Sequence, residues 1–311
     1  MTLTERIAQP CKPPCFDAEA KADMPGDVLN LSPALKQVAG RAFPSLWAAL
    51  QQKLRPGCER ATIGVFGGSG SGKTGLTALW QQAFAQQGLS ALRMSGDNYP
   101  HRIPCENDAE RVRLFRQAGV DALLDAGVYT DAVREALLAL WQSGLDADPA
   151  QTAEHPWLAV YQQGGAARLA RYLGTAEELN FDRLNRVLLD FQSGAEAVLM
   201  RRFGRTPDAL WFERVPASGS SLLLLEWTHA GSSEVRGLDL RVYLHTTPEE
   251  TKAFRLARGR DPGADSPFVA MVLQLEQAKL NAQAASADLV MLRDGTCMTA
   301  AAFAARKGEN P

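Results

Sequence analysis

A glycine-rich stretch that ends in Lys73 and Thr74 has the residue types and the spacing to bind phosphate. Residues 63–74 read Ile-Gly-Val-Phe-Gly-Gly-Ser-Gly-Ser-Gly-Lys-Thr and contain the pattern G-x-x-x-x-G-K-T. Glycine has no Cβ, so the backbone can turn its N–H groups toward phosphate oxygens at the positive end of the following helix. Lys73 is then expected to reach the β- and γ-phosphates of a nucleoside triphosphate, and the Thr74 hydroxyl to ligate Mg²⁺. The residues that this pattern assigns to nucleotide binding are Gly68, Ser69, Gly70, Ser71, Gly72, Lys73 and Thr74.

The segments on both sides of the loop support this interpretation. Residues 61–66 are typical of a buried strand, and the apolar residues of 76–84 lie on one face of a predicted helix that ends at Gly88. A flexible Gly/Ser linker does not explain a Lys-Thr pair placed between the glycines and a helix. A dinucleotide-binding loop that begins at Gly68 is not supported, because the third glycine of G-x-G-x-x-G would fall on Lys73.

Two acidic residues follow predicted strands, at the positions where open α/β sheets bind their ligands. Asp97 comes shortly after a predicted strand at residues 89–94, and Glu226 ends the apolar run 222–225. A kinase needs a base that accepts the proton of the attacking hydroxyl, so Asp97 is the candidate base and Lys73 a second catalytic residue. Glu226 is expected to hold Mg²⁺ through water. The alternatives are that Asp97 caps a turn and that Glu226 is a simple strand-end residue.

Aromatic and basic residues near these acids are candidates for the acceptor site. They are Tyr99, His101, Arg102, Arg205 and His229. Arg201 and Arg202 add to the positive charge next to Arg205. If this segment folds back over the carboxyl edge of the sheet, its arginines would favour an acceptor that already carries a phosphate or carboxylate. The alternative is that these arginines face solvent at the end of a helix, where positive charge offsets the helix dipole.

Three further arginines lie at the end of a predicted helix and are candidates for a mobile lid. Arg255, Arg258 and Arg260 are expected to stabilise charge on the transferring phosphoryl group, Arg255 by binding the nucleotide and the other two in catalysis. Taken alone, such a run of arginines is also typical of a solvated helix face.

Composition indicates a globular protein that works on small molecules. The chain has 311 residues, 46% of them hydrophobic, and a net charge of −2, which gives no electrostatic footprint for nucleic acid or membrane. The N-terminus lacks the apolar region of a signal peptide and no apolar run could span a bilayer, so we expect a cytoplasmic protein. Five scattered cysteines, an odd number, predict reduced thiols, and Cys11 and Cys15 lack partners for a metal site.

The order of predicted elements indicates an α/β protein with a doubly wound parallel sheet of the P-loop NTPase type and a helical insertion. Residues 1–54 are expected to form an extended arm and packing helices that break at Pro44. Residues 55–105 and 220–311 are expected to form the core. Residues 106–219 form the predicted insertion on the acceptor side; within it, residues 106–205 have alanine- and leucine-rich helical patterns without a convincing strand, and 175–178 has the spacing of a capping box.

The order of motifs resembles the phosphoribulokinase and uridine kinase family of phosphate-loop kinases over roughly residues 60–105 and 220–292. The segments that carry the resemblance are GGSGSGKT, SGDNYPHR, LLLLEW, DLRVYL, RLARGRD and ADLV. The resemblance implies ATP and Mg²⁺ binding by Lys73 and Thr74, a catalytic base at Asp97 and a lid formed by the arginines at 255, 258 and 260. The chain departs from the family at Trp227, where a glycine is expected, and in the insertion.

The sequence therefore predicts an ATP-dependent kinase that transfers the γ-phosphoryl group to a hydroxyl of a sugar, sugar phosphate or nucleoside-like metabolite, with Mg²⁺ as cofactor. One alternative is an enzyme similar to adenylylsulfate kinase, and another is a regulator that binds ATP without catalysis. The acceptor is a small molecule whose identity the sequence leaves open, as it does the oligomeric state.

Overall fold

The chain folds into two compact units in the computed structural model, which describes residues 2–16, 29, 31–204, 206, 208–258 and 266–309. The sheet unit comprises Met1–Tyr99, Asn180–Thr247 and Leu280–Pro311. The helical unit comprises Pro100–Leu179 and Pro248–Lys279.

The described part of the sheet unit contains a six-stranded sheet in the order β2-β5-β1-β6-β7-β8. All neighbouring strands are parallel except β7 and β8. The register pairs Val65 of β1 and Ser95 of β2 with Glu226 of β5. The carboxyl ends of β2, β5 and β1 therefore lie side by side. The strands are β1 (Ala61–Gly67), β2 (Ala91–Ser95), β5 (Leu222–Glu226), β6 (Leu240–Leu244), β7 (Leu289–Met291) and β8 (Cys297–Met298).

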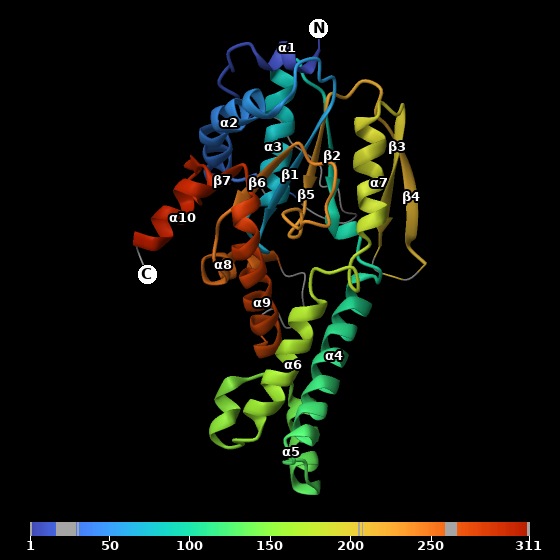
Figure 1. The fold of residues 1–311 in the computed structure, drawn as a ribbon, viewed down its shortest axis with the longest axis vertical. Helices are drawn as coiled ribbons and strands as arrows, with labels where there is room; N and C mark the ends of the chain where they lie inside the picture. Colours follow the sequence, from blue (N-terminus) through green and yellow to red (C-terminus); the bar gives the residue numbers. More distant parts are fainter. Residues whose placement is uncertain are drawn as a thin grey trace. The chain divides into compact units, whose positions relative to one another are not determined.

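Helices cover both faces of this sheet (Figure 1). On one face, α2 (Pro33–Lys53) and α3 (Lys73–Gln86) pack on alternate strand residues such as Ile63 and Leu224. On the other face lie α7 (Phe181–Gln192), which packs against β1, and α10 (Ala300–Glu309), whose Phe303 packs edge-on against Tyr243. The predicted α/β fold with a doubly wound, mostly parallel sheet is confirmed.

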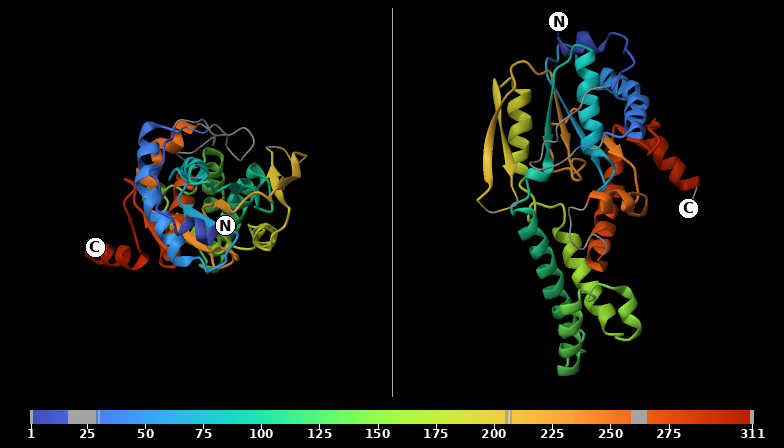
Figure 2. Two further views of the ribbon diagram at one scale, coloured as in Figure 1. Left: turned by 90° about the horizontal axis from the view of Figure 1, so that it is seen from above. Right: turned by 180° about the vertical axis from the view of Figure 1, so that it is seen from behind.

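A two-stranded antiparallel sheet, whose first strand lies within residues 106–205, corrects the expectation that this block contains no strand. It is formed by β3 (Ala197–Phe203) and β4 (Leu210–Pro216), and β3 lies beside α7 (Figure 2). Most side chains of β4 are exposed, so this strand lacks the buried apolar pattern by which strands are recognised. Both α7 and this hairpin belong to the sheet unit, which differs from the predicted boundaries of the insertion.

The helical unit is built around closely packed helices α4 and α6. Gly119 and Gly165 permit the close approach: a Cβ atom added to Gly119 would lie 2.4 Å from the Tyr161 ring, and one added to Gly165 would lie 2.3 Å from the Phe115 ring. The two rings pack edge to face with centroids 5.3 Å apart. The helices of this unit are α4 (Pro104–Asp125), α5 (Asp131–Ser143), α6 (Leu158–Tyr172), α8 (Pro248–Arg258) and α9 (Pro267–Gln283), and Pro149–Ala153 form a short 3₁₀ turn.

Three local predictions are wrong for identifiable reasons. Helix α2 continues through Pro44 instead of breaking there. The N-terminal arm is not extended throughout, because α1 (Leu3–Ile7) buries both of its terminal apolar residues against the core, and residues 17–28 and 30 of the predicted arm lie outside the described residues. Residues 175–178 do not cap a helix, because Glu178 is fully buried and accepts hydrogen bonds from Asn107, Arg111 and the N–H of Gly174.

Candidate active site

The phosphate loop connects β1 to α3 in a conformation that requires glycine. Gly70 and Gly72 have φ values of 80° and 90°, in the left-handed region that other residues rarely adopt. A Cβ atom on Gly67 would lie 2.7 Å from the carbonyl oxygen of Leu244, so the loop also passes too close to β6 for a side chain. Lys73 is buried, and its Nζ donates to the carbonyl oxygens of Gly67 and Gly68 at 2.9 and 3.0 Å. The lysine is thus held inside the loop.

Two features of this loop fit the phosphates of a nucleotide. Gly72 caps α3 without a side-chain hydrogen bond, which leaves the first backbone N–H groups of a 14-residue helix for an anion. The Oγ atom of Ser71 is buried and has no hydrogen-bond partner within the described part of the chain. A buried hydroxyl without a partner is costly unless a ligand satisfies it. A phosphate oxygen at the loop would do so.

Asp97 and Glu226 lie close together beside Thr74. Glu226 is 4% exposed, and its Oε2 accepts a hydrogen bond from the Thr74 hydroxyl at 3.1 Å. Burial raises the pKa of Glu226 to about 7, and repulsion by Asp97 contributes to the rise, whereas Lys73 acts in the opposite direction. Asp97 itself is exposed, on the short 3₁₀ turn Gly96–Asn98 that follows β2. The exposed Asp97 carboxylate can be reached by a substrate as a base, whereas the buried Glu226 carboxylate is held by its hydrogen bond to Thr74.

These groups fit Mg²⁺, which binds oxygen ligands and usually needs only one or two carboxylates in addition to substrate phosphates and water. Thr74 and Glu226 would hold the ion, and a cation would offset the repulsion between the two carboxylates. When bound, Mg²⁺ neutralises charge on the β- and γ-phosphates. Across the described residues, no cluster of three or more His, Cys, Asp or Glu side chains could hold a metal by itself, so the nucleotide would have to supply further ligands.

Replacing Thr74 with alanine is expected to reduce the advantage of Mg²⁺-ATP over metal-free ATP by on the order of tenfold, because one oxygen ligand is lost. Calorimetric titration of ATP with and without Mg²⁺ measures the difference. Thr77→Val is the control, since Thr77 lies on the same helix and bonds only the carbonyl oxygen of Thr74 through its hydroxyl. If the difference in ATP affinity with and without Mg²⁺ is the same in Thr74→Ala as in the parent, Thr74 is not a ligand of the metal.

Ser95 belongs to this site although the sequence analysis did not assign it. Its hydroxyl hydrogen-bonds to Glu226 and accepts the backbone N–H of Asp97 at 3.4 Å. It therefore connects the two acids. The available signal was its position as the last residue of β2, at the carboxyl edge of the sheet.

Tyr99 and His229, predicted to contact substrate, are buried in the sheet unit. Tyr99 is 1% exposed, and its hydroxyl accepts the backbone N–H of Arg201 at 3.3 Å. His229 is 6% exposed and packs edge-on against Trp227, with ring centroids 5.3 Å apart. Packing accounts for both side chains without a substrate, and their roles in binding stay predictions.

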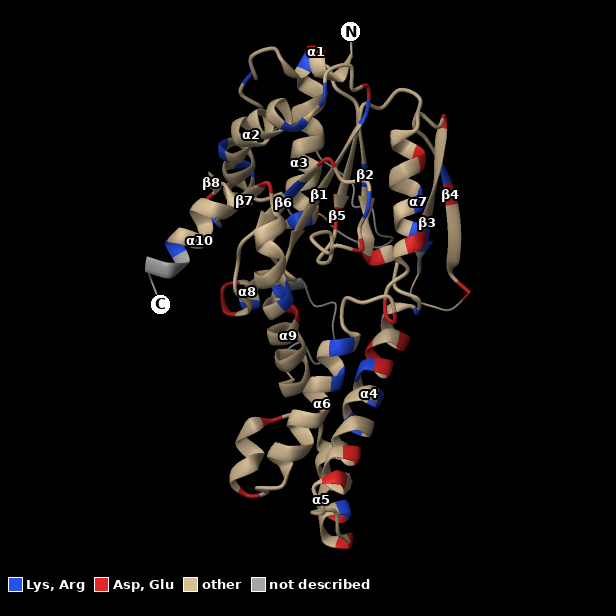
Figure 3. Cartoon of the chain, in the orientation of Figure 1, with Lys and Arg blue, Asp and Glu red and all other residues tan. Residues whose placement is uncertain are grey.

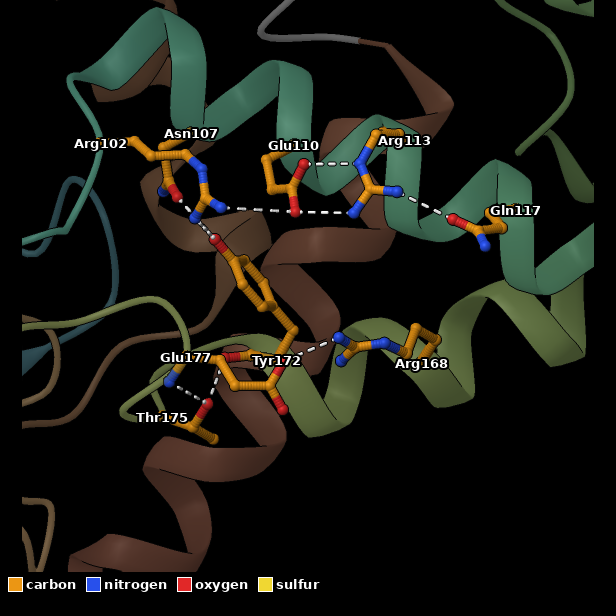
Figure 4. A network of polar contacts seen from close by, with 9 residues as sticks. All are labelled: Arg102, Asn107, Glu110, Arg113, Gln117, Arg168, Tyr172, Thr175 and Glu177. Carbon is orange, nitrogen blue, oxygen red and sulfur yellow. Dashed lines mark hydrogen bonds and ion pairs between the residues drawn. The ribbon is translucent and has the colours of Figure 1, made fainter.

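Arg102 and His101 lie in the helical unit, where Arg102 joins a network of polar side chains (Figure 4). The Arg102 guanidinium donates to the Tyr172 hydroxyl at 3.2 Å and lies 3.6 Å from a carboxylate oxygen of Glu110. A ring nitrogen of His101 lies 3.1 Å from the carbonyl oxygen of Ala176. Glu110 also accepts hydrogen bonds from Arg113 at 2.7 and 2.8 Å, so Arg102 shares this carboxylate with a second arginine.

The remaining predicted arginines fall in several environments. Arg201 and Arg202 are buried on strand β3, and Arg202 pairs with Glu213 at 2.9 Å, so the alternative of a solvated helix end is wrong for these two. Arg255 lies on α8 and donates to the carbonyl oxygen of Pro248 at 2.8 Å. Arg258 ends α8, but its side chain, like all of Arg205 and Arg260, lies outside the described residues.

The chain is similar to a bifunctional alpha-galactosidase/sucrose kinase, AgaSK, of Mediterraneibacter gnavus. The two are 37% identical over 262 residues, which cover 82% of this chain and 23% of that protein. The chain thus spans about a quarter of the length of this curated relative. No family model matches the chain.

Solved structures with similar folds include two kinases. Phosphoribulokinase from Rhodobacter spheroides is 16% identical with a TM-score of 0.47, over 75% of this chain and 70% of that one. D-glycerate 3-kinase from Cryptococcus neoformans var. grubii is 12% identical with a TM-score of 0.46, over 86% and 99%.

Charge is mixed over the described surface. Figure 3 shows acidic and basic residues interspersed along α4, and the net charge of the chain is −2. None of the helices in the described ranges is both long and apolar enough to cross a membrane.

Proposed function

We propose that the chain is an ATP-dependent kinase that transfers the γ-phosphoryl group of ATP to a hydroxyl group of a sugar. The observation that carries this proposal is the exposed Asp97 beside the buried Glu226 at the carboxyl edge of the sheet, where strand β1 enters the phosphate loop. A regulator that only binds ATP has no need of an exposed base at this position. The name of the 37% identical relative, which includes a sucrose kinase, supports a sugar as the acceptor.

Most of the catalytic and binding roles are assigned to residues of the sheet unit. The loop backbone, Ser71 and Lys73 bind the phosphates, and Thr74 and Glu226 hold Mg²⁺. Asp97 accepts the proton of the acceptor hydroxyl. At the same time the oxygen of that hydroxyl bonds to the γ-phosphorus, and the bond between the γ-phosphorus and the oxygen of the leaving ADP breaks. Positioning and charge stabilisation account for most of the catalysis in such a transfer. The lid arginines Arg258 and Arg260 would add to that stabilisation.

The acceptor is proposed to be uncharged. Arg202 pairs with Glu213, but Glu110 beside Arg102 is also held by Arg113 through hydrogen bonds of 2.7 and 2.8 Å, so the proposal of an uncharged acceptor rests on the relative whose name includes a sucrose kinase. An acceptor that carries a phosphate or carboxylate stays the alternative.

Incubating the chain with ATP, Mg²⁺ and a pooled panel of sugars, sugar phosphates, nucleosides and adenylylsulfate tests the proposal by the masses of the products. We expect one or more free sugars to gain a phosphoryl group. Phosphorylated adenylylsulfate would instead support an enzyme similar to adenylylsulfate kinase. Bound ATP without any phosphorylated product would support a regulator that only binds ATP.

Replacing Arg102 with alanine is expected to raise the KM for a free sugar by about tenfold, since the hydrogen bonds that are lost go to uncharged hydroxyl groups, and to leave the KM for ATP little changed. An anionic acceptor would lose charge-assisted bonds, and its KM would rise by about a hundredfold. Arg134→Ala, an exposed arginine of α5 in the same unit, is the control. A hundredfold rise with a preferred sugar phosphate would contradict the uncharged acceptor.

The proposed compartment is the cytoplasm. None of the five cysteines, all of which are among the described residues, forms a disulfide bond, which suits a reducing compartment that also supplies ATP.

A further inference from the structure

The indole of Trp227 packs directly on the backbone that carries the candidate base. Trp227 follows Glu226. The backbone N–H of Trp227 donates to the carbonyl oxygen of Val65 at 3.0 Å, which extends the β5–β1 ladder by one residue. Because Ser95 pairs with Glu226, the next residues of the two chains, Gly96 and Trp227, are also neighbours. The Trp227 side chain is only 2% exposed.

This contact leaves no room for a side chain at residue 96. A Cβ atom on Gly96 would lie 2.1 Å from Cγ and 2.3 Å from Cδ2 of Trp227. Gly96 does not have a positive φ, so its backbone conformation is open to other residues. The glycine is therefore required by the indole and not by the turn itself. Gly96 begins the turn whose second residue is Asp97.

Other aromatic rings fix the indole in place. Phe181, the first residue of α7, lies with its ring centroid 5.5 Å from that of Trp227, and His229 packs edge-on at 5.3 Å. Aromatic contacts of this kind stabilise a ring position beyond the effect of simple burial. The position of the indole is thus defined by the end of β5, the start of α7 and the segment after β5.

We propose that Trp227 is a positioning residue for phosphoryl transfer, which holds the turn Gly96–Asn98 so that the Asp97 carboxylate keeps a fixed distance from the phosphate loop. This inference rests on the proposed kinase function. Trp227 does not contact the reacting atoms in this account and acts through Gly96. Its importance follows from the sensitivity of such reactions to geometry, because a displacement of about 1 Å can lower a rate by on the order of a hundredfold.

A set of variants at these two positions tests the proposal. Trp227→Leu is expected to lower kcat by about 10- to 100-fold with little change in either KM, and Trp227→Phe to keep most of the activity because an aromatic ring remains on Gly96. Gly96→Ala should lower kcat to a similar extent in the parent. The same substitution should lower kcat much less in the Trp227→Leu background, where the smaller side chain leaves space. This non-additivity identifies a direct coupling between the two residues.

A readout without catalysis accompanies the kinetics. Amide hydrogen exchange at residues 96–99 is expected to be faster in Trp227→Leu than in the parent. Trp47→Leu is the matched control, because Trp47 is 3% exposed on α2 in the same unit and its loss should lower Tm without changing kcat or that exchange.

The outcomes separate this inference from the function on which it rests. Trp227→Leu could lose as much stability as Trp47→Leu and still keep the parental kcat and the slow amide exchange at residues 96–99. That result would show that Trp227 is a packing residue only. A parent that phosphorylates no acceptor would contradict the kinase function. In that case faster exchange in Trp227→Leu alone still supports control of the turn by Trp227, and equal exchange overturns it.

Discussion

Lys73→Ala is expected to lower kcat/KM for phosphoryl transfer by on the order of 10²- to 10⁴-fold. In the structure the Lys73 ammonium is buried in the phosphate loop, within hydrogen-bonding distance of the Gly67 and Gly68 carbonyl oxygens. Contacts of this charge with the β- and γ-phosphates are worth about 1.5–3 kcal/mol each, and two of them account for the expected loss. Steady-state kinetics with saturating acceptor and varied ATP measure it.

Two further variants show whether the loss is chemical or structural. Lys73→Met keeps the apolar stem of the side chain and should be as inactive as Lys73→Ala, with a Tm closer to that of the parent. Lys53→Ala removes an exposed lysine that pairs with Asp288 on the surface, and it should leave the kinetics unchanged. If Lys73→Ala binds and turns over ATP like the parent, the phosphate loop does not have the role assigned to it.

Asp97→Asn is expected to lower kcat by on the order of 10²- to 10⁴-fold while the affinity for ATP stays largely intact. The amide has the shape of the carboxylate but cannot accept the proton of the acceptor hydroxyl. Asp97 is exposed, so the substitution leaves no buried cavity and should change stability little. Rates under single-turnover conditions, combined with ATP titration, separate chemistry from binding.

The control for Asp97 is another exposed acid of the sheet unit. Asp182→Asn changes the same charge in the first turn of α7 and should keep the parental rate. A variant Asp97→Asn that loses ATP affinity but keeps its rate would indicate that Asp97 binds metal or supports the fold instead of acting as a base.

The parts of the site that the sequence predicts are those whose residues are close together in the chain or stand at the end of an apolar strand. The phosphate loop is contiguous, and Gly72 has the backbone conformation that favours glycine. Asp97 and Glu226 were candidates because each stands at or after the end of a predicted strand, and the order of the strands then brings them together.

The parts that the sequence does not predict depend on contacts between distant segments. The contact of Trp227 with Gly96 depends on the pairing of β2 with β5, which no local pattern reveals. Glu178 has the spacing of a helix cap, yet it is buried by Asn107 and Arg111, which come from another part of the chain. Strand β4 was missed because a mostly exposed strand does not carry the alternation of buried and exposed residues.

The central claim is most directly tested by following the γ-phosphoryl group itself. ATP with a radioactive γ-phosphoryl group is incubated with the chain, Mg²⁺ and sucrose or another free sugar, and the labelled products are separated from inorganic phosphate. The account predicts that the label appears in a sugar phosphate in proportion to the ADP formed, and that Asp97→Asn forms it far more slowly. Label found only in inorganic phosphate, or retained entirely in bound ATP with every acceptor of the panel, would contradict the assignment as a sugar kinase.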